Sequence, residues 1–175
     1  MPLWRAKRNR AAETEAVEQR VSDIEKTPHG NLSLVTLLAT DYLNHFVEII
    51  MLIELLPEMP DLAEECRDWK PLTYEEHFAK SQIADRDLAR QAYALVPERY
   101  RTPFEATSDK LHGLVQDYLE KILKALDGDD KARTTHLCLE AVYILNGHLQ
   151  TLNGIIHGGE FVLDQKDIDQ LVHTA

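Results

Sequence analysis

The sequence predicts an all-α protein in which four long helices pack as an antiparallel, up-down-up-down bundle. Three observations favour this fold class. The seven prolines and most of the seven glycines lie between long stretches that contain neither residue. These stretches are rich in Leu, Ala, Glu, Lys and Gln, which favour helix over strand. Their apolar residues recur at spacings of three and four, which gives each predicted helix one face to bury.

The first core helix is expected over residues 31–56, with Asn31 or Ser33 as its N-cap. The connection that follows, over residues 57–72, is long enough for a crossover, although a plain up-down path is the simpler expectation. Within this connection, a proline followed by an aspartate favours a short helix over about residues 60–69.

A capping box, Thr73-Tyr-Glu-Glu76, predicts that the second core helix spans residues 73–95. In this motif the threonine oxygen and the glutamate each satisfy a free backbone N–H at the helix start. The apolar stripe of the helix is interrupted, because Ser81 and Asp85 fall on it.

The motif recurs at Thr102-Pro-Phe-Glu105, which predicts a third core helix over residues 103–126. The turn Asp127-Gly-Asp-Asp130 follows, with a glycine past the helix end and an aspartate to cap the next helix. The fourth core helix is then expected over residues 131–157, before two consecutive glycines.

The ends of the chain are expected to differ from the core. Residues 1–10 are basic and are predicted to form a flexible arm, whereas residues 11–175 have the length of a single domain. Short additional helices are expected near residues 11–25 and 165–172.

Composition disfavours several classes of partner. The net charge of -11 repels phosphate backbones and anionic lipid headgroups, so we expect neither nucleic acid nor a membrane as partner. The most apolar stretch, residues 43–56, is too short and too charged to span a bilayer. The basic start does not run into the apolar segment of a signal peptide, so a cytoplasmic location is predicted. The two cysteines have no CxxC partner and suggest neither a zinc ribbon nor a disulfide framework.

A polar patch interrupts the otherwise apolar first core helix. Asp41, Asn44, His45 and Glu48 recur at spacings of three and four on one side. One interpretation is a window to solvent. The other is a polar layer inside the bundle, in which the imidazole and the carboxylates would need hydrogen bonds, ion pairs or a metal ion to offset desolvation.

A metal site is the alternative hypothesis for this patch. We estimate how high each residue lies above the end of the bundle at which the first core helix starts, using a rise of 1.5 Å per residue. This places His45 at about 20 Å, Glu48 at about 24 Å, His112 at about 14 Å and Glu140 at about 26 Å. The candidate ligands are therefore Asp41, His45, Glu48, His112 and Glu140. The Glu-x-x-His pair of di-iron bundles does not occur in the sequence. We therefore predict no cofactor, with a metal ion as the alternative.

One face of the fourth core helix is a candidate interface. Tyr143, Gly147, Gln150 and Gly154 share a stripe, and each glycine within a helix costs about 1 kcal/mol relative to alanine. Close approach of a second helix, within the bundle or across a twofold axis, would compensate for this cost. The other interpretation is an incidental pair of glycines on an exposed, slightly weakened helix.

No motif predicts catalysis, since the sequence has neither a Gly-x-Ser-x-Gly elbow nor a phosphate-binding glycine loop. The leading hypothesis is a non-enzymatic helical-bundle protein that binds another protein or itself, for example as a homodimer. The alternative is a metal-binding or small-molecule-binding bundle with a His/carboxylate site at mid-height.

Overall fold

The computed structural model describes residues 19–24, 26 and 30–159, and these residues form an all-helical structure without β-strands. The predicted fold class, all-α, is confirmed. The elements in chain order are η1 (Thr40–Leu43), α2 (Asn44–Leu55), η2 (Pro60–Leu62), α3 (Ala63–Asp68), α4 (Tyr74–Lys80), α5 (Arg86–Tyr93), α6 (Glu98–Asp127) and α7 (Lys131–Ile156).

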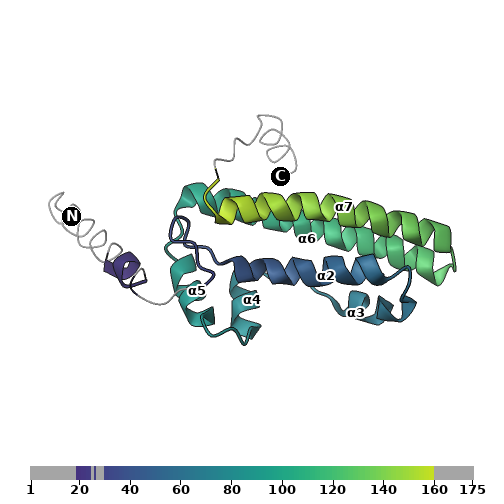
Figure 1. Cartoon of the computed structure of the whole chain (residues 1–175), viewed down its shortest axis with the longest axis horizontal. Coiled ribbons are helices and arrows are strands. Elements are labelled where there is room, and N and C mark those ends of the chain that lie inside the picture. Colours follow the sequence, from purple (N-terminus) through teal and green to yellow (C-terminus); the bar gives the residue numbers. More distant parts are fainter. Residues whose placement is uncertain (1–18, 25, 27–29, 160–175) are drawn as a thin grey trace, which may run out of the picture.

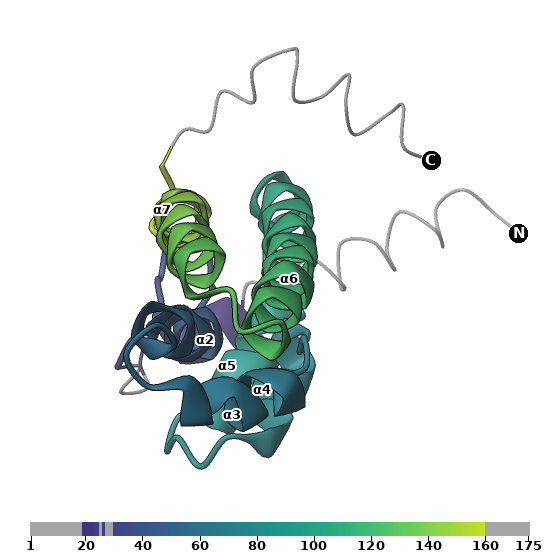
Figure 2. The ribbon, with the colours of Figure 1, turned by 90° about the vertical axis from the view of Figure 1, so that its right-hand side faces the viewer.

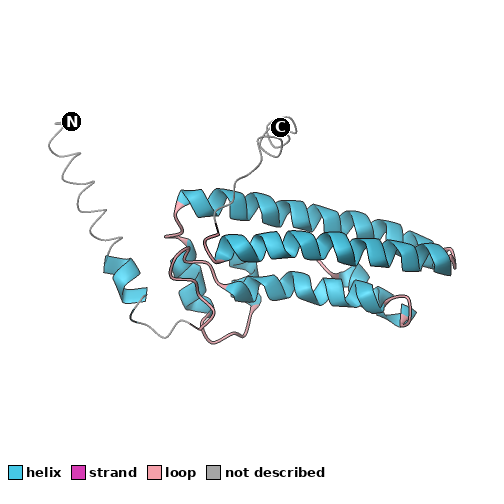
Figure 3. Ribbon diagram, turned by 45° about the horizontal axis from the view of Figure 1, so that its top comes forward, coloured by secondary structure: helices cyan, strands magenta, loops and turns pink. Residues whose placement is uncertain are grey.

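Three long helices dominate the arrangement (Figure 1). α6 and α7 form an antiparallel hairpin around the turn at residues 128–130, and α2 lies along this hairpin (Figure 3). Seen end on, the short helices α3, α4 and α5 lie on the remaining side, next to α2 and α6 (Figure 2). The side on which a second long helix was expected is therefore built from short helices.

The first core helix begins later than predicted. Residues 31–39 form a loop in which the Leu37 N–H donates to the Ser33 carbonyl and the Thr40 N–H donates to the Asn31 carbonyl. Leu37 has a φ of 63°, which a right-handed helix does not allow. The side-chain amide of Asn31 donates to the Asp41 carboxylate and caps no helix. The prediction of helix from residue 31 was therefore wrong, because local backbone hydrogen bonds close this segment into a loop.

The second core helix, predicted over residues 73–95, is broken into α4 and α5. Its capping box is confirmed, because the Glu76 N–H donates to the Thr73 hydroxyl and the Glu76 carboxylate accepts from the Thr73 N–H. At Ser81 the backbone becomes extended, with ψ at 150°, and the hydroxyl accepts a hydrogen bond from the N–H two residues later. α5 begins directly after Asp85. Ser81 and Asp85, the two polar residues on the apolar stripe, thus mark the two ends of the break between α4 and α5. The prediction of one continuous helix missed this break.

The third core helix, predicted over residues 103–126, lies within the longer α6. This helix begins at Glu98, directly after a proline. The hydroxyl of Thr102 donates to the Glu98 carboxylate, so the second predicted capping box was wrong. Pro103 consequently lies inside the helix, where it cannot donate a backbone hydrogen bond to the residue four positions earlier.

Two further helix predictions are confirmed. α7 matches the fourth core helix predicted over residues 131–157, and the Asp130 side chain caps it by accepting from the Arg133 N–H. η2 and α3 together match the short helix predicted over residues 60–69.

Most residues at the two ends of the chain lie outside the part that the structure describes. Residues 19–24 and 26 are helical, as expected for the end of the helix predicted at 11–25. The arm at residues 1–10 and the helix at 165–172 fall outside the described part of the chain. Among the described residues, no helix is both long enough and apolar enough to cross a bilayer.

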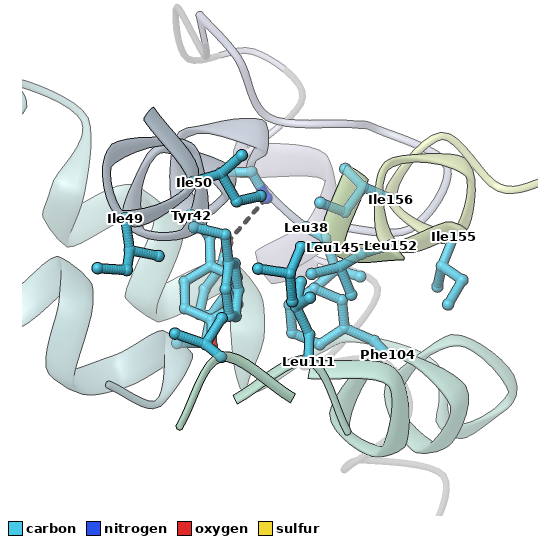
Figure 4. Packing of buried hydrophobic residues seen from close by; sticks show 14 of the residues in the cluster. Leu38, Tyr42, Ile49, Ile50, Phe104, Leu111, Leu145, Leu152, Ile155 and Ile156 are labelled. Atoms are coloured by element: carbon cyan, nitrogen blue, oxygen red, sulfur yellow. Dashed lines mark hydrogen bonds between the residues drawn. The ribbon is translucent and has the colours of Figure 1, made fainter. Parts of the chain in front are cut away.

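The core lies between α2, α6 and α7. Phe104 and Leu111 of α6 lie together with Leu145 and Leu152 of α7, and all four side chains are buried (Figure 4). The hydroxyl of Thr36 donates to the Ile156 carbonyl, which attaches the loop before η1 to the C-terminal end of α7. α2 and α7 are consequently held antiparallel.

We expect Phe104→Ala to lower the free energy of unfolding by about 3–5 kcal/mol, because the truncation leaves a cavity among fully buried side chains. Denaturant unfolding followed by circular dichroism measures this change. The exposed Glu120 on the same helix provides the control, and Glu120→Ala should change the free energy by less than about 0.5 kcal/mol. Equal effects of the two variants would contradict this description of the core.

Candidate functional site

The structure brings together two of the residues predicted to form the metal site. His45 of α2 and His112 of α6 are 6% and 8% exposed, and their ring centroids lie 5.6 Å apart. Of the other candidates, Asp41 is half-buried and its carboxylate accepts from Asn31, Glu48 is exposed, and Glu140 is exposed and accepts from the Tyr118 hydroxyl. The polar patch is therefore buried at its histidine and open to solvent at Glu48.

A third histidine, His77 of α4, joins these two and was missed by the sequence analysis. Its ring centroid lies 6.1 Å from that of His45. The capping box that begins at Thr73 fixes the start of α4 and places His77 one turn into the helix. His77 is three residues after the buried Tyr74, and this spacing could have identified it. We call His45, His77 and His112 the histidine cluster.

His45 holds the connection between α3 and α4 against α2. Its Nε2 atom accepts a hydrogen bond from the Leu72 N–H at 3.2 Å, which requires a neutral ring with the proton on Nδ1. The Tyr42 hydroxyl donates to the Leu72 carbonyl at 2.9 Å and also bonds to the Ser108 hydroxyl at 2.7 Å. The indole of Trp69 stacks on the His45 ring, with 4.9 Å between centroids. Both backbone groups of Leu72 are thus paired with side chains from η1 and α2.

The electrostatic setting keeps the histidine cluster neutral. Burial lowers the pKa of His45 to about 4, and repulsion from His112 and His77 acts in the same direction. Burial also lowers the pKa of His77, which the carbonyl and carboxylate of Asp41 and the carboxylate of Glu48 oppose. For His112 burial again lowers the pKa, against the attraction of Asp109 and Glu76. All three imidazoles are therefore uncharged at neutral pH.

Two imidazole nitrogens in the cluster remain unpaired. Within the described part of the chain, His77 Nε2 and His112 Nε2 are buried without a hydrogen-bond partner. No group of three or more His, Cys, Asp or Glu side chains among the described residues is placed to hold a metal ion. The lone pair of His45 Nε2 already serves Leu72, so His45 would have to release this bond in order to bind a metal.

The second candidate site is the outer face of α7, which faces away from α2 and α6. Leu139 and Tyr143 are 67% and 80% exposed, respectively. Gly147 and Gln150 are exposed, and Gly154 is half-buried. A Cβ atom added to Gly147 would meet no other described atom within 4 Å, so this glycine makes no close approach to the part of the chain that the structure describes. We define the outer face of α7 by His136, Leu139, Tyr143, Gly147, Gln150 and Gly154.

This face differs from the rest of the chain in its lack of charge. Charged residues make up 28% of the chain, yet residues 141–159 contain no Asp, Glu, Lys or Arg. From residue 134 onwards, the single charged residue of α7 is Glu140, which binds Tyr118 of α6. Leu139, which the sequence analysis did not assign to the interface, extends the same uncharged surface by one turn.

A cleft of about 540 Å³ near the α6–α7 turn is a third feature. It is lined by Leu56, Pro57, Glu58, Pro60, Ala63, Arg67, Leu126, Asp127, Asp129, Asp130, Lys131 and Thr134. Arg67 lies 2.7 Å from the Asp127 carboxylate, and the Asp130 carboxylate caps α7. These polar groups already have structural roles, and we assign the cleft no function.

The two cysteines are buried and unpaired. Burial raises the pKa of both Cys66 and Cys138 to about 11, so neither thiol is ionised at neutral pH. Buried, protonated thiols are poor nucleophiles and poor metal ligands.

No known protein-family model matches the sequence, and comparisons with curated proteins and with solved structures found no match. The proposals below therefore rest on the residues and their geometry alone.

We expect stability to fall as the pH is lowered from 6.5 towards 4. Because the folded protein holds the pKa of His45 at about 4 against 6.5 for a free imidazole, the unfolded chain takes up the proton first. This difference contributes stability on the order of 3 kcal/mol, fully present above pH 6.5 and lost as the pH falls towards 4. Denaturant unfolding at a series of pH values measures the slope.

His45→Gln provides the matched variant, because its amide oxygen can accept from the Leu72 N–H without titrating in this range. It should flatten the pH dependence, whereas His157→Gln, at an exposed histidine after α7, should leave it unchanged. An equally steep slope in His45→Gln would show that other groups cause the acid sensitivity.

Proposed function

We propose that this chain is a non-enzymatic helical protein that acts by binding another protein, or a second copy of itself, through the outer face of α7. The observation that carries this proposal is the exposure of Leu139 and Tyr143 on a helical face whose single charged neighbour from residue 134 onwards is Glu140, in a chain of net charge -11. Protein interfaces are depleted in charged residues and enriched in tyrosine, as this face is. Exposed apolar patches bordered by polar residues often mark interaction sites.

The energetics of tyrosine burial and of glycine within a helix also favour this face as the binding surface. Tyrosine contributes a large apolar area together with a hydroxyl that can hydrogen-bond at a partly wet boundary, which is why it is frequent at binding hot spots. Gly147 weakens α7 by about 1 kcal/mol relative to alanine, and among the described residues no close packing at this position offsets that cost. Close contact with a partner at this position would offset that cost.

The proposal extends to the helix arrangement, the cellular location and the class of partner. We propose that α2, α6 and α7 correspond to three helices of an antiparallel bundle and that α3 and α4 replace the fourth. The reduced, buried cysteines Cys66 and Cys138 are compatible with action in the cytoplasm. The net charge of -11 favours a protein partner over nucleic acid or an anionic membrane.

A second candidate function is metal or small-molecule binding at the histidine cluster. The juxtaposition of His45 and His112, together with the unpaired Nε2 atoms of His77 and His112, favours it. Of the ligands suggested by the sequence, Glu48 and Glu140 are exposed to solvent. This candidate is weaker than the first, because metal binding would require the imidazoles to reorient.

A crosslinking experiment tests the binding proposal. With a photo-crosslinking amino acid in place of Tyr143, illumination of intact producing cells should give a discrete adduct, because this side chain would be buried against the partner. The same amino acid in place of Glu120, exposed on α6, is the control and should give none. If neither position gives an adduct, the outer face of α7 is not a binding surface.

Elemental analysis of protein purified without added metal tests the second candidate. If the cluster binds an ion, a transition metal should be present in stoichiometric amount and should be lost in His112→Gln. Absence of a metal would rule out this candidate, and an ion that persists in His112→Gln would be held elsewhere.

A further inference from the structure

Four residues of α7 lie on one narrow stripe of its outer face. Successive residues are rotated by about 100° around an α-helix, which places positions 136, 143, 147 and 154 within about 40° of one another. Along the stripe the order of these four residues is ring, ring, glycine, glycine: His136, Tyr143, Gly147 and Gly154, and the exposed Glu140 lies at the edge of the stripe, about 20° from Gly147 by the same rotation. The two rings are seven residues apart, as are the two glycines, so each pair is separated by about two turns.

In an antiparallel copy of the same stripe the order is reversed, so a glycine of one copy can lie opposite a ring of the other. If a second α7 lies antiparallel across a twofold axis that passes beside residue 145, then position 143 faces position 147 of the other helix. Position 136 faces position 154 in the same register, because both pairs have residue 145 as their midpoint. The Tyr143 ring would therefore lie over Gly147, where the missing side chain lets the helices come close, and the His136 ring would face the half-buried Gly154.

We propose that two copies of this chain pair through the outer faces of their α7 helices, antiparallel, with Tyr143 and His136 of each copy seated on Gly147 and Gly154 of the other. This inference rests on the proposed function, since it names the partner of the same face. Tyr143 is 80% exposed, and there is space at Gly147 that no described atom fills. Leu139 lies beside the stripe and extends the apolar contact outwards.

Charge favours a second copy at this face in particular. Two molecules that each carry a net charge of -11 repel one another, and the repulsion is smallest where neither presents an ionised side chain. Residues 141–159 contain no Asp, Glu, Lys or Arg, so Glu140 is the single charged residue between His136 and Gly154. Glu140 is exposed at the border of this surface, and its carboxylate accepts a hydrogen bond from the Tyr118 hydroxyl of α6.

The decisive test compares two glycines. Gly113 of α6, like Gly147, is an exposed helical glycine at which an added Cβ would meet no described atom within 4 Å. Gly113→Gln and Gly147→Gln should therefore both fold and both gain helix propensity. We expect light scattering to give twice the chain mass of 20.0 kDa for the natural sequence and for Gly113→Gln. Gly147→Gln should weaken dimerisation at least about tenfold, because its side chain occupies the seat of the Tyr143 ring.

Disulfide trapping tests the register. Two differently tagged chains, one with Tyr143→Cys and the other with Gly147→Cys, should form a mixed disulfide on mild oxidation. Tyr143→Cys alone should couple to itself poorly, because the twofold axis separates the two copies of this position. Efficient self-coupling of Tyr143→Cys would overturn the proposed register.

The outcomes separate this inference from the proposed function. Raising the salt concentration should strengthen dimerisation, because it screens the repulsion between two acidic chains. A strictly monomeric natural chain at high protein and salt concentration would overturn the dimer, as would a fully dimeric Gly147→Gln. If such a monomer still gave a photo-adduct at position 143 with a protein of another mass, the binding face would stand with a different partner. If no adduct formed either, both proposals would fail.

Discussion

The hydrogen bond from the Leu72 N–H to Nε2 of His45 fixes the connection between α3 and α4 to the side of α2. Helices as short as α3 and α4 are not stable alone in water, because the free-energy cost of helix nucleation exceeds the stabilisation that so few residues provide. Their position therefore depends on tertiary anchors. The Tyr42 hydroxyl, bonded to the Leu72 carbonyl, and the Tyr74 hydroxyl, bonded to the Ala39 N–H, complete this anchoring. The arrangement requires an uncharged imidazole, since a protonated ring has no lone pair to offer Leu72.

The two candidate sites have different physical characters. The histidine cluster is enclosed by aromatic rings and joins three elements of the fold, so we assign it mainly to stability. The outer face of α7 makes no comparable contribution to the core, because its side chains point away from α2 and α6. On an acidic protein such a face would ordinarily carry charge for solubility. Its neutrality, together with the exposure of Tyr143, is what directs the functional proposal to this surface.

The helix content and most helix ends could be predicted from the sequence, because they depend on local chemistry. The Thr73 capping box and the Asp130 cap satisfy backbone groups within a few residues. The positive φ of Leu37 could not be predicted in this way, since leucine rarely adopts that conformation and only the surrounding loop stabilises it. The break after Lys80 had a visible signal in Ser81 and Asp85, but the pattern alone does not distinguish a break from a polar interruption.

Of the candidate sites, the helical heights placed His45 and His112 within about 6 Å of each other, and the structure brings their rings together, although the helix starts assumed for that estimate were wrong. His77 lies one turn after the predicted Thr73 capping box, so its spacing from Tyr74 was the available signal for its place in the cluster. Nitrogen NMR of the His45 imidazole in the folded protein tests whether a neutral His45 anchors the short helices. At pH 7 we expect an uncharged ring with its proton on Nδ1 and with Nε2 accepting a hydrogen bond. A protonated ring, or a neutral ring with its proton on Nε2, would contradict this expectation.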